Sequence, residues 1–137
     1  MIAFEEKYEL LRKLVEVLVS SSESGAAIIV EGKRDESSLK RLGVRKGIFR
    51  LKALNKNFYD FVFEVEKAKE AILMLDFDKE GEKMAKKLIE ELTKSKVKVN
   101  NSIWRRMRDL TRPEVKGVEE LANYIEKISR KASGEKL

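Results

Sequence analysis

Three acidic residues are the part of this sequence best suited to chemistry. Glu31 follows the apolar run 26–30 directly, and Asp76, with Asp78 two residues later, follows the apolar run 71–75 in the same way. If both runs are neighbouring strands of an open α/β sheet, their carboxyl ends lie about 4.8 Å apart. The three carboxylates should then converge at the sheet edge where such folds place their functional sites.

Carboxylates at such close range repel one another unless a cation compensates their charge. The chain contains no histidine and no cysteine, so a metal ion must be held by oxygen ligands. Oxygen ligands favour hard ions such as Mg²⁺, Mn²⁺ or Ca²⁺, and Mg²⁺ commonly completes its shell with substrate phosphate. We therefore predict a Mg²⁺ site at Asp76, Asp78 and Glu31, with Mn²⁺ as a possible substitute. The same inventory excludes Ser–His and Cys–His catalytic systems.

Structural explanations compete with the metal-binding interpretation of some of these acids. Asp78 and Asp35 each stand where a helix is expected to begin, and an acidic side chain is favoured there as a cap. For either residue, capping and ligand roles both stay open. Asp76 and Glu31 directly follow buried apolar runs, which favours a functional role. Gly81 is expected to allow a tight turn into the helix after Asp78.

Basic residues are placed where they could meet a polyanion. Lys33 and Arg34 stand beside Glu31, and a second cluster follows the expected fourth strand: Trp104, Arg105, Arg106, Arg108 and Arg112. Arginine binds phosphate in a forked geometry, and an exposed tryptophan can stack on a base. The alternative is that Trp104 belongs to the core and that the arginines are solvated or paired with Asp109 and Glu114.

The surrounding pattern predicts the elements that must position these residues. Short apolar runs predict strands at 26–30, 47–51, 71–75 and 97–99. Apolar residues at helical spacing predict helices over 4–18, after the first strand, over 84–92 and over 118–128, whereas residues 58–65 fit either a helix or a strand. Strands alternating with helices imply an α/β fold with a mostly parallel four-stranded sheet flanked by helices, preceded by an extra N-terminal helix.

Composition narrows the class of protein further. A chain of 137 residues with 42% hydrophobic content suits one domain with a real core. No apolar run is long enough to span a bilayer, so we expect no membrane association and a cytoplasmic location. A charged fraction of 39% is typical of proteins from thermophiles. The net charge of +6 favours a polyanionic partner.

Two stretches carry a resemblance to a known family. "IIVEGKRDESSLKRLG", followed by "ILMLDFDKEGEKMAKKLIEEL", resembles the Toprim domain, in which a glutamate follows the first strand and Asp-x-Asp follows the third. The resemblance covers roughly residues 26–125 and is greatest to small stand-alone Toprim proteins. Toprim domains also occur in topoisomerases, primases and ribosomal-RNA maturation ribonucleases. The resemblance implies a Rossmann-like fold and phosphodiester chemistry.

The resemblance also implies roles for individual residues. Glu31 matches the glutamate proposed as general acid or base, while Asp76 and Asp78 match the acids that coordinate Mg²⁺. The supporting positions that match are Gly32, Asp35 and Gly81. Lys33, Arg34 and the arginines of the second cluster are expected to position the nucleic-acid backbone.

We therefore expect a Mg²⁺-dependent nuclease or related phosphoryl-transfer enzyme, with RNA favoured over DNA as substrate. Its expected organisation is an N-terminal helix and connector at 1–25, a Toprim domain at 26–130 and a flexible tail at 131–137. The N-terminal helix could bind a protein partner or a second copy of the chain. One alternative is a non-catalytic nucleic-acid-binding or scaffold module. Another is a phosphatase like the haloacid dehalogenases, with Asp76 as nucleophile.

Overall fold

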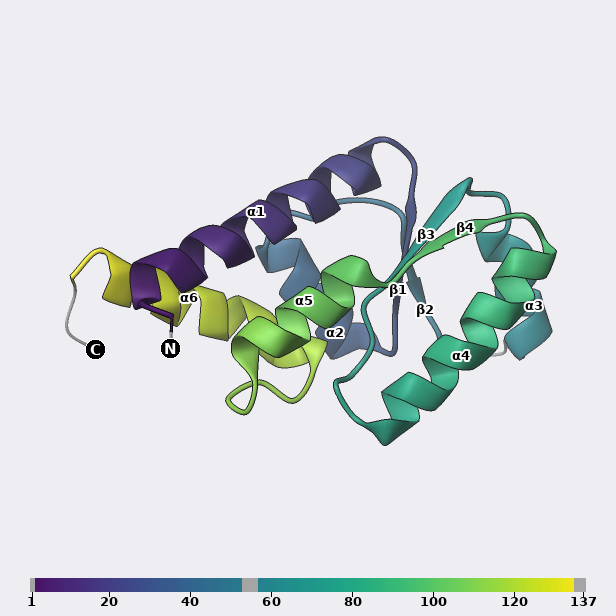
Figure 1. Cartoon of the computed structure of the whole chain (residues 1–137). Helices are drawn as coiled ribbons and strands as arrows, with labels where there is room; N and C mark the ends of the chain where they lie inside the picture. Colours follow the sequence, from purple (N-terminus) through teal and green to yellow (C-terminus); the bar gives the residue numbers. More distant parts are fainter. Residues whose placement is uncertain (1, 53–56, 135–137) are drawn as a thin grey trace.

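Four parallel strands form one sheet at the centre of the molecule (Figure 1). The computed structural model describes residues 2–52 and 57–134. The strands are β1 (Ala27–Val30), β2 (Ile48–Arg50), β3 (Glu70–Leu73) and β4 (Lys98–Asn100), and they are arranged in the order β2-β1-β3-β4. Every pairing is parallel, which confirms the predicted fold class.

Helices cover both faces of this sheet. They are α1 (Phe4–Glu23), α2 (Lys33–Arg41), α3 (Phe58–Val65), α4 (Lys79–Lys94), α5 (Ser102–Thr111) and α6 (Leu121–Ala132), with a 3₁₀ turn η1 (Val118–Glu120) before α6. Helices α3 and α4 lie side by side on one face, while α1, α2, α5 and α6 pack together on the other (Figure 1). None of the helices in the described ranges is long and apolar enough to cross a membrane.

The strand order reverses between β1 and β3. From β1 the chain moves outward in one direction to β2, and from β3 it moves outward in the other direction to β4. The two central strands pair directly, with Ile29 opposite Leu73, and the amide of Met74 continues the ladder by donating to the Ile29 carbonyl at 2.8 Å. The carboxyl ends of β1 and β3 therefore meet at the point where open α/β folds bind their ligands.

The central strands read as continuous apolar runs because both of their faces are covered. All four residues of β1 are buried, as are Met74 and Leu75 beyond the end of β3. Parallel sheets flanked by helices on both sides require this kind of strand. The single tryptophan, Trp104, is also fully buried, and it packs from α5 against the end of β3.

Some boundaries differ from those expected. The first helix, expected over 4–18, continues to Glu23. Its last turn is held by Ser22, which is buried and whose hydroxyl donates to the carbonyl of Lys46. Residues 58–65 form a helix, and α5 was not anticipated as an element. Of the tail expected at 131–137, Ala132 still belongs to α6, and residues 135–137 lie outside the described residues.

Candidate functional site

Glu31 and Asp76 meet at the carboxyl ends of β1 and β3. The backbone N–H of Asp76 donates a hydrogen bond to Glu31 Oε2 at 2.8 Å. Glu31 therefore bridges the two central strands, and its charge stabilises the turn that carries Asp76. This contact brings together the two acidic residues that the sequence singled out at the ends of separate strands.

Asp76 lies in an environment that opposes its ionisation. Burial, and after it the negative charges of Glu31, Asp35 and Asp78, raise the pKa of the Asp76 carboxyl to about 7. Each of these causes disfavours the carboxylate form and would be relieved by a cation.

The other two acids of the site cap helices. Asp78 precedes α4, and its Oδ1 accepts a hydrogen bond from the Gly81 N–H at 2.7 Å. Asp35 lies in the first turn of α2, where its Oδ2 accepts from the Gly32 N–H at 2.9 Å. Helix capping therefore occurs at both positions for which it was considered. One oxygen of each carboxylate makes the capping bond.

Two glycines fit closely around Asp76. A Cβ atom on Gly81 would lie 2.1 Å from the backbone oxygen of Asp76, and a Cβ on Gly117 would lie 2.5 Å from its Oδ1. Gly81 lies within α4, so its backbone makes no unusual turn. Glycine is required there because the Asp76 backbone approaches it so closely. Gly117 was not predicted from the sequence, since it lies 41 residues after Asp76 and belongs to no recognisable motif there.

A second backbone contact fixes the turn between the acids. The N–H of Phe77 donates to the carbonyl of Lys116 at 3.0 Å, which ties this turn to the loop before η1. The Phe77 side chain is half-buried and packs against the core. The inward position of this ring leaves Asp78, the acid that follows it, exposed.

A pocket of about 300 Å³ opens at this junction. We call it the acidic pocket; its lining includes Glu31, Asp35, Asp76, Glu119 and the basic residues Lys33, Arg34 and Lys52. Lys33 and Arg34 are exposed, as expected of residues that meet a substrate, and Arg34 makes only a loose 4.0 Å pair with Glu119. The pocket thus combines buried and half-buried acids with exposed cationic side chains.

The donor set of the acidic pocket suits a hard divalent ion. Glu31 and Asp76 supply carboxylate oxygens of the type that Mg²⁺ prefers. Asp78 does not line this pocket: it is exposed and lines a separate pocket with Glu82 and Arg108. Across residues 2–52 and 57–134, no three acidic side chains are already grouped closely enough to hold a metal ion. Asp78 in particular would have to share its carboxylate between the cap and the ion.

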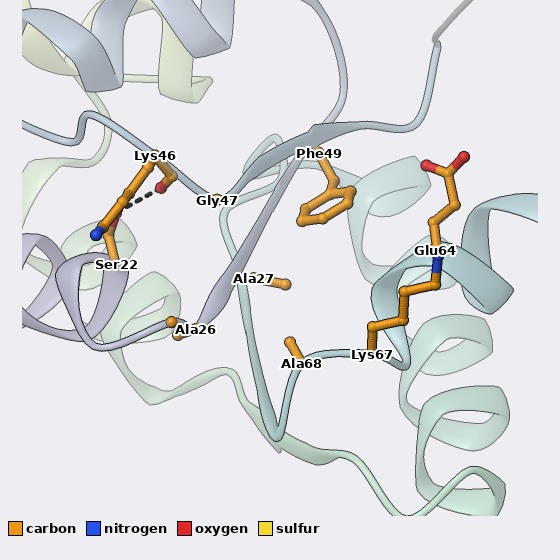
Figure 2. A pocket seen from close by; sticks show the side chains of 10 residues that line it. Ser22, Ala26, Ala27, Lys46, Gly47, Phe49, Glu64, Lys67 and Ala68 are labelled. Carbon is orange, nitrogen blue, oxygen red and sulfur yellow. Dashed lines mark hydrogen bonds between the residues drawn. The ribbon is translucent and has the colours of Figure 1, made fainter.

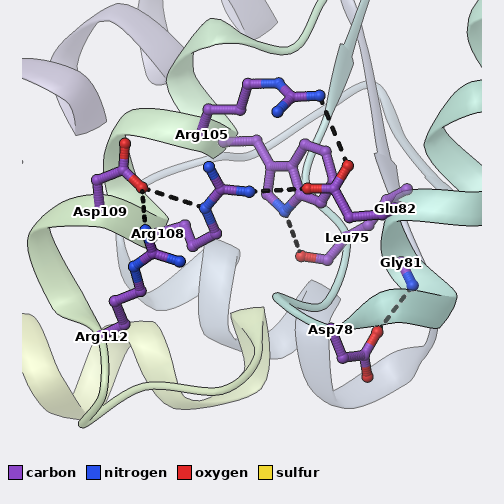
Figure 3. Close-up of polar contacts among 9 residues, drawn as sticks. Leu75, Asp78, Gly81, Glu82, Arg105, Arg108, Asp109 and Arg112 are labelled. Carbon is purple, nitrogen blue, oxygen red and sulfur yellow. Dashed lines mark hydrogen bonds and ion pairs between the residues drawn. The ribbon is translucent and has the colours of Figure 1, made fainter.

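The arginines after β4 are largely engaged in ion pairs (Figure 3). Arg108 and Arg105 both reach Glu82 on α4, at 2.7 and 3.5 Å, and Arg108 and Arg112 both pair with Asp109. The pairing with Asp109 was considered from the sequence, whereas Glu82 was not foreseen. Arg106 is exposed on the same helix.

Trp104 belongs to the core. It is fully buried, and its Nε1–H donates to the carbonyl of Leu75 at 2.7 Å, one residue before Asp76 (Figure 3). Stacking on a nucleic-acid base is therefore wrong for this residue, because no part of the ring reaches the surface. Its function is instead to hold the end of β3, from which the acidic turn departs.

Another pocket lies at the opposite edge of the sheet (Figure 2). Its lining includes Ser22, Ala26, Lys46, Gly47, Phe49 and Lys67. Ala26 and Gly47 immediately precede β1 and β2, so this pocket faces the amino ends of the strands. It is larger than the acidic pocket, at about 450 Å³, but none of the predicted site residues lines it.

Comparison with known proteins gives one domain match and several close relatives. Residues 25–101 match the Toprim domain family. A UPF0292 protein of Thermococcus kodakarensis is 38% identical over 92% of both chains, and one of Methanocaldococcus jannaschii is 37% identical over 90% of this chain and 95% of its own. A solved structure of a protein from Aquifex aeolicus, 27% identical, superposes with a TM-score of 0.68 over 79% of this chain and 94% of that one.

Proposed function

The chain belongs to the Toprim domain family, and we propose that it is a Mg²⁺-dependent enzyme that makes or breaks phosphodiester bonds in nucleic acid. The observation that carries this proposal is the contact between Glu31 and the turn bearing Asp76. It places both acids at the strand-order reversal of a parallel sheet, where ligand sites of such folds occur.

The electrostatics of the acidic pocket support binding of a metal and a phosphate together. Helices α2 and α4 begin beside the pocket, and the amino ends of helices favour anions. Lys33, Arg34 and Lys52 add positive charge at the rim. The acids inside the pocket favour a cation, whereas the helix ends and the basic side chains favour an anion. A metal ion together with a phosphate group would satisfy both.

Each residue has a role in this proposal. Toprim domains typically bind Mg²⁺; here Asp76 and Asp78 would hold the ion, which when bound supplies charge neutralisation at the phosphate. Glu31 Oε2 already accepts the Asp76 N–H, so its carboxylate is fixed in place to take or give a proton, or to share a second ion. Lys33 and Arg106 are exposed and can neutralise the backbone, and Arg34 would give up only its loose pair with Glu119. Arg105 and Arg108 must first leave Glu82.

RNA is the substrate that we propose first, since the sequence around Glu31 is similar to that of the ribosomal-RNA maturation ribonucleases. The decisive test is cleavage of structured RNA and DNA in Mg²⁺ by wild type, Asp76→Asn and Asp60→Asn. Asp60 is an exposed acid on α3 away from the acidic pocket and serves as the matched control. We expect Asp76→Asn to lose at least about 100-fold in rate, as is usual when a group that stabilises transition-state charge is removed, and Asp60→Asn to match wild type.

One observation favours a second candidate, a nucleic-acid-binding module without catalysis. Glu31 and Asp78 both accept backbone N–H groups, so each carboxylate also stabilises the fold. A binding module predicts salt-sensitive association with RNA that persists in Asp76→Asn and shows no turnover in Mg²⁺ or Mn²⁺. That result would replace the enzymatic proposal.

A further inference from the structure

A second pocket opens directly beside the acidic pocket, between the start of α3 and the outer side of α4. Its volume is about 430 Å³, within the range of sites that bind small molecules. We call it the apolar pocket, because its floor is formed by Leu51, Phe58, Phe61 and Met84. The Phe61 ring is buried, and Leu51, Phe58 and Met84 are half-buried, so apolar surface faces the opening.

The two pockets adjoin each other. Glu31 and Lys52 line both of them, so the boundary between the pockets is formed by these two side chains. A ligand with one anionic end and one flat apolar end could therefore occupy both at once. Its anionic end would lie near Asp76, and its apolar end would lie over Phe58.

The rim of the apolar pocket is charged and aromatic. The ammonium group of Lys87 lies 4.2 Å from the centroid of the Phe58 ring, and the Tyr59 ring meets the Phe58 ring edge to face at 5.6 Å. Glu80 supplies a carboxylate at the same rim. Aromatic rings beside lysines are the groups with which proteins stack bases and neutralise the adjoining backbone.

We propose that the apolar pocket binds a nucleobase of the nucleotide whose phosphate lies in the acidic pocket. This inference rests on the proposed function and adds to it a determinant of substrate position. Phe58 and Met84 provide contact for the ring, while Lys52 and Lys87 attract the polyanion. The carboxylate of Glu80 can accept a hydrogen bond from the exocyclic amino group of a base.

Three small probes separate the two halves of this site. Adenosine 5′-monophosphate, ribose 5-phosphate and adenosine are titrated in Mg²⁺ by calorimetry and by amide chemical shifts. We expect the monophosphate to bind about fivefold or more tightly than ribose 5-phosphate, which corresponds to the lower end of base–aromatic stacking. Shifts from the base should fall on α3 and α4.

Matched variants of one helix test the contact itself. Phe58→Leu keeps apolar volume but removes the ring, and Phe63→Leu makes the same change at a residue that is 62% exposed and outside the pocket. The preference for the nucleotide over ribose 5-phosphate should disappear in Phe58→Leu and persist in Phe63→Leu. Thermal unfolding of both variants establishes that each is folded during the titration.

The outcomes also distinguish this inference from the proposed function. Equal affinity for the monophosphate and ribose 5-phosphate, or a preference that survives Phe58→Leu, would overturn the nucleobase pocket and leave the phosphate site standing. Equal affinity for adenosine and the monophosphate would support the base pocket while contradicting phosphate binding near Asp76. If no probe binds, the inference is wrong, and the RNA cleavage assay still decides the function on its own.

Discussion

At the scale of single residues, the two strand-end acids have different tasks. Glu31 accepts a hydrogen bond from the backbone N–H of Asp76 and so is held in place by the fold. Asp76 lies among other acids, and burial together with their charges raises its pKa. Repulsion among these acids should lower the stability of the folded protein when no cation compensates their charge.

The pKa of Asp76 makes stability depend on pH. Its folded pKa of about 7 lies above the ordinary unfolded value, so folded protein holds the proton between the two values and stability falls as pH rises through this window. Asp76→Asn lacks this penalty. We expect the free energy of unfolding of Asp76→Asn to exceed that of wild type by about 1–2 kcal/mol near pH 8, where solvent screening weakens the repulsion. Near pH 4 the two free energies should be equal.

Urea unfolding of both proteins across this pH range, with chelator present, measures the difference. Addition of Mg²⁺ should narrow the gap at high pH by stabilising the wild type alone. A gap that is constant with pH would show that Asp76 ionises normally.

Gly117 should prove as important for the acidic pocket as the acids themselves. In Gly117→Ala the new methyl group would lie 2.5 Å from Asp76 Oδ1, so the carboxylate or its loop must move. We expect Mn²⁺ affinity to fall by about tenfold or more, as when a neighbour of a metal ligand is disturbed. Gly134→Ala is the control, because Gly134 lies beyond the end of α6, does not line the acidic pocket, and a Cβ there meets nothing within 4 Å. Equal Mn²⁺ affinity in the two variants would contradict this role.

At the scale of elements, ion pairs join α4 to α5. Glu82 holds Arg105 and Arg108, which keeps two cationic groups of the arginine cluster from meeting a polyanion (Figure 3). The pairs are partly exposed, so each contributes little to stability. Their greater effect should be on binding.

Glu82→Gln should therefore strengthen binding of nucleic acid. Releasing the two arginines makes more phosphate contacts possible, and we expect affinity to rise about threefold at low salt, with a steeper dependence on salt concentration. Fluorescence anisotropy with labelled RNA at several salt concentrations measures both quantities. Glu90→Gln, on the exposed side of α4, is the control. If both variants bind as wild type does, the arginine cluster lies away from the nucleic acid.

The elements predicted correctly from the sequence are those whose buried residues form a continuous run or recur at helical spacing. The buried runs of β1 and β3 and the stripe of α4 follow from hydrophobic patterning alone, and neighbouring parallel strands then bring Glu31 to Asp76. Helix α5 was not predicted, because its many charged residues obscure the helical spacing of the buried Ile103, Trp104 and Met107. The pairing with Glu82 and the contact with Gly117 depend on tertiary packing, which no local pattern encodes.

At the scale of the whole molecule, α1 is part of the body of the protein. It packs along α6 and α5, and it buries Leu11, Leu14 and Leu18 in the common core. Phe4, in line with Leu11 and Leu18 at the start of the helix, is still partly exposed beside Lys131 of α6, and Val17 is exposed farther along the helix. A partner or second copy binding through this helix, as the sequence suggested, would have to use the surface that α5 and α6 leave uncovered.

Leu18→Ala tests whether α1 is integral to the fold. Leu18 is fully buried, and its truncation leaves a cavity, so we expect a loss of about 2–5 kcal/mol in the free energy of unfolding. Val17→Ala changes a side chain that is 51% exposed and should cost little. Urea denaturation compares them. A small effect for Leu18→Ala would mean that α1 can detach, leaving it free to bind elsewhere.

The position of Trp104 gives the protein an optical reporter of its own. It is the only tryptophan in the chain, it is shielded from solvent, and its indole N–H is bonded to the Leu75 carbonyl, next to Asp76. Indole emission shifts to longer wavelength when water reaches the ring, so unfolding should produce a red shift without any attached dye. Because the bonded carbonyl precedes the acidic turn, a change in emission intensity on adding Mg²⁺ or nucleotide would report movement at that turn in the unmodified protein.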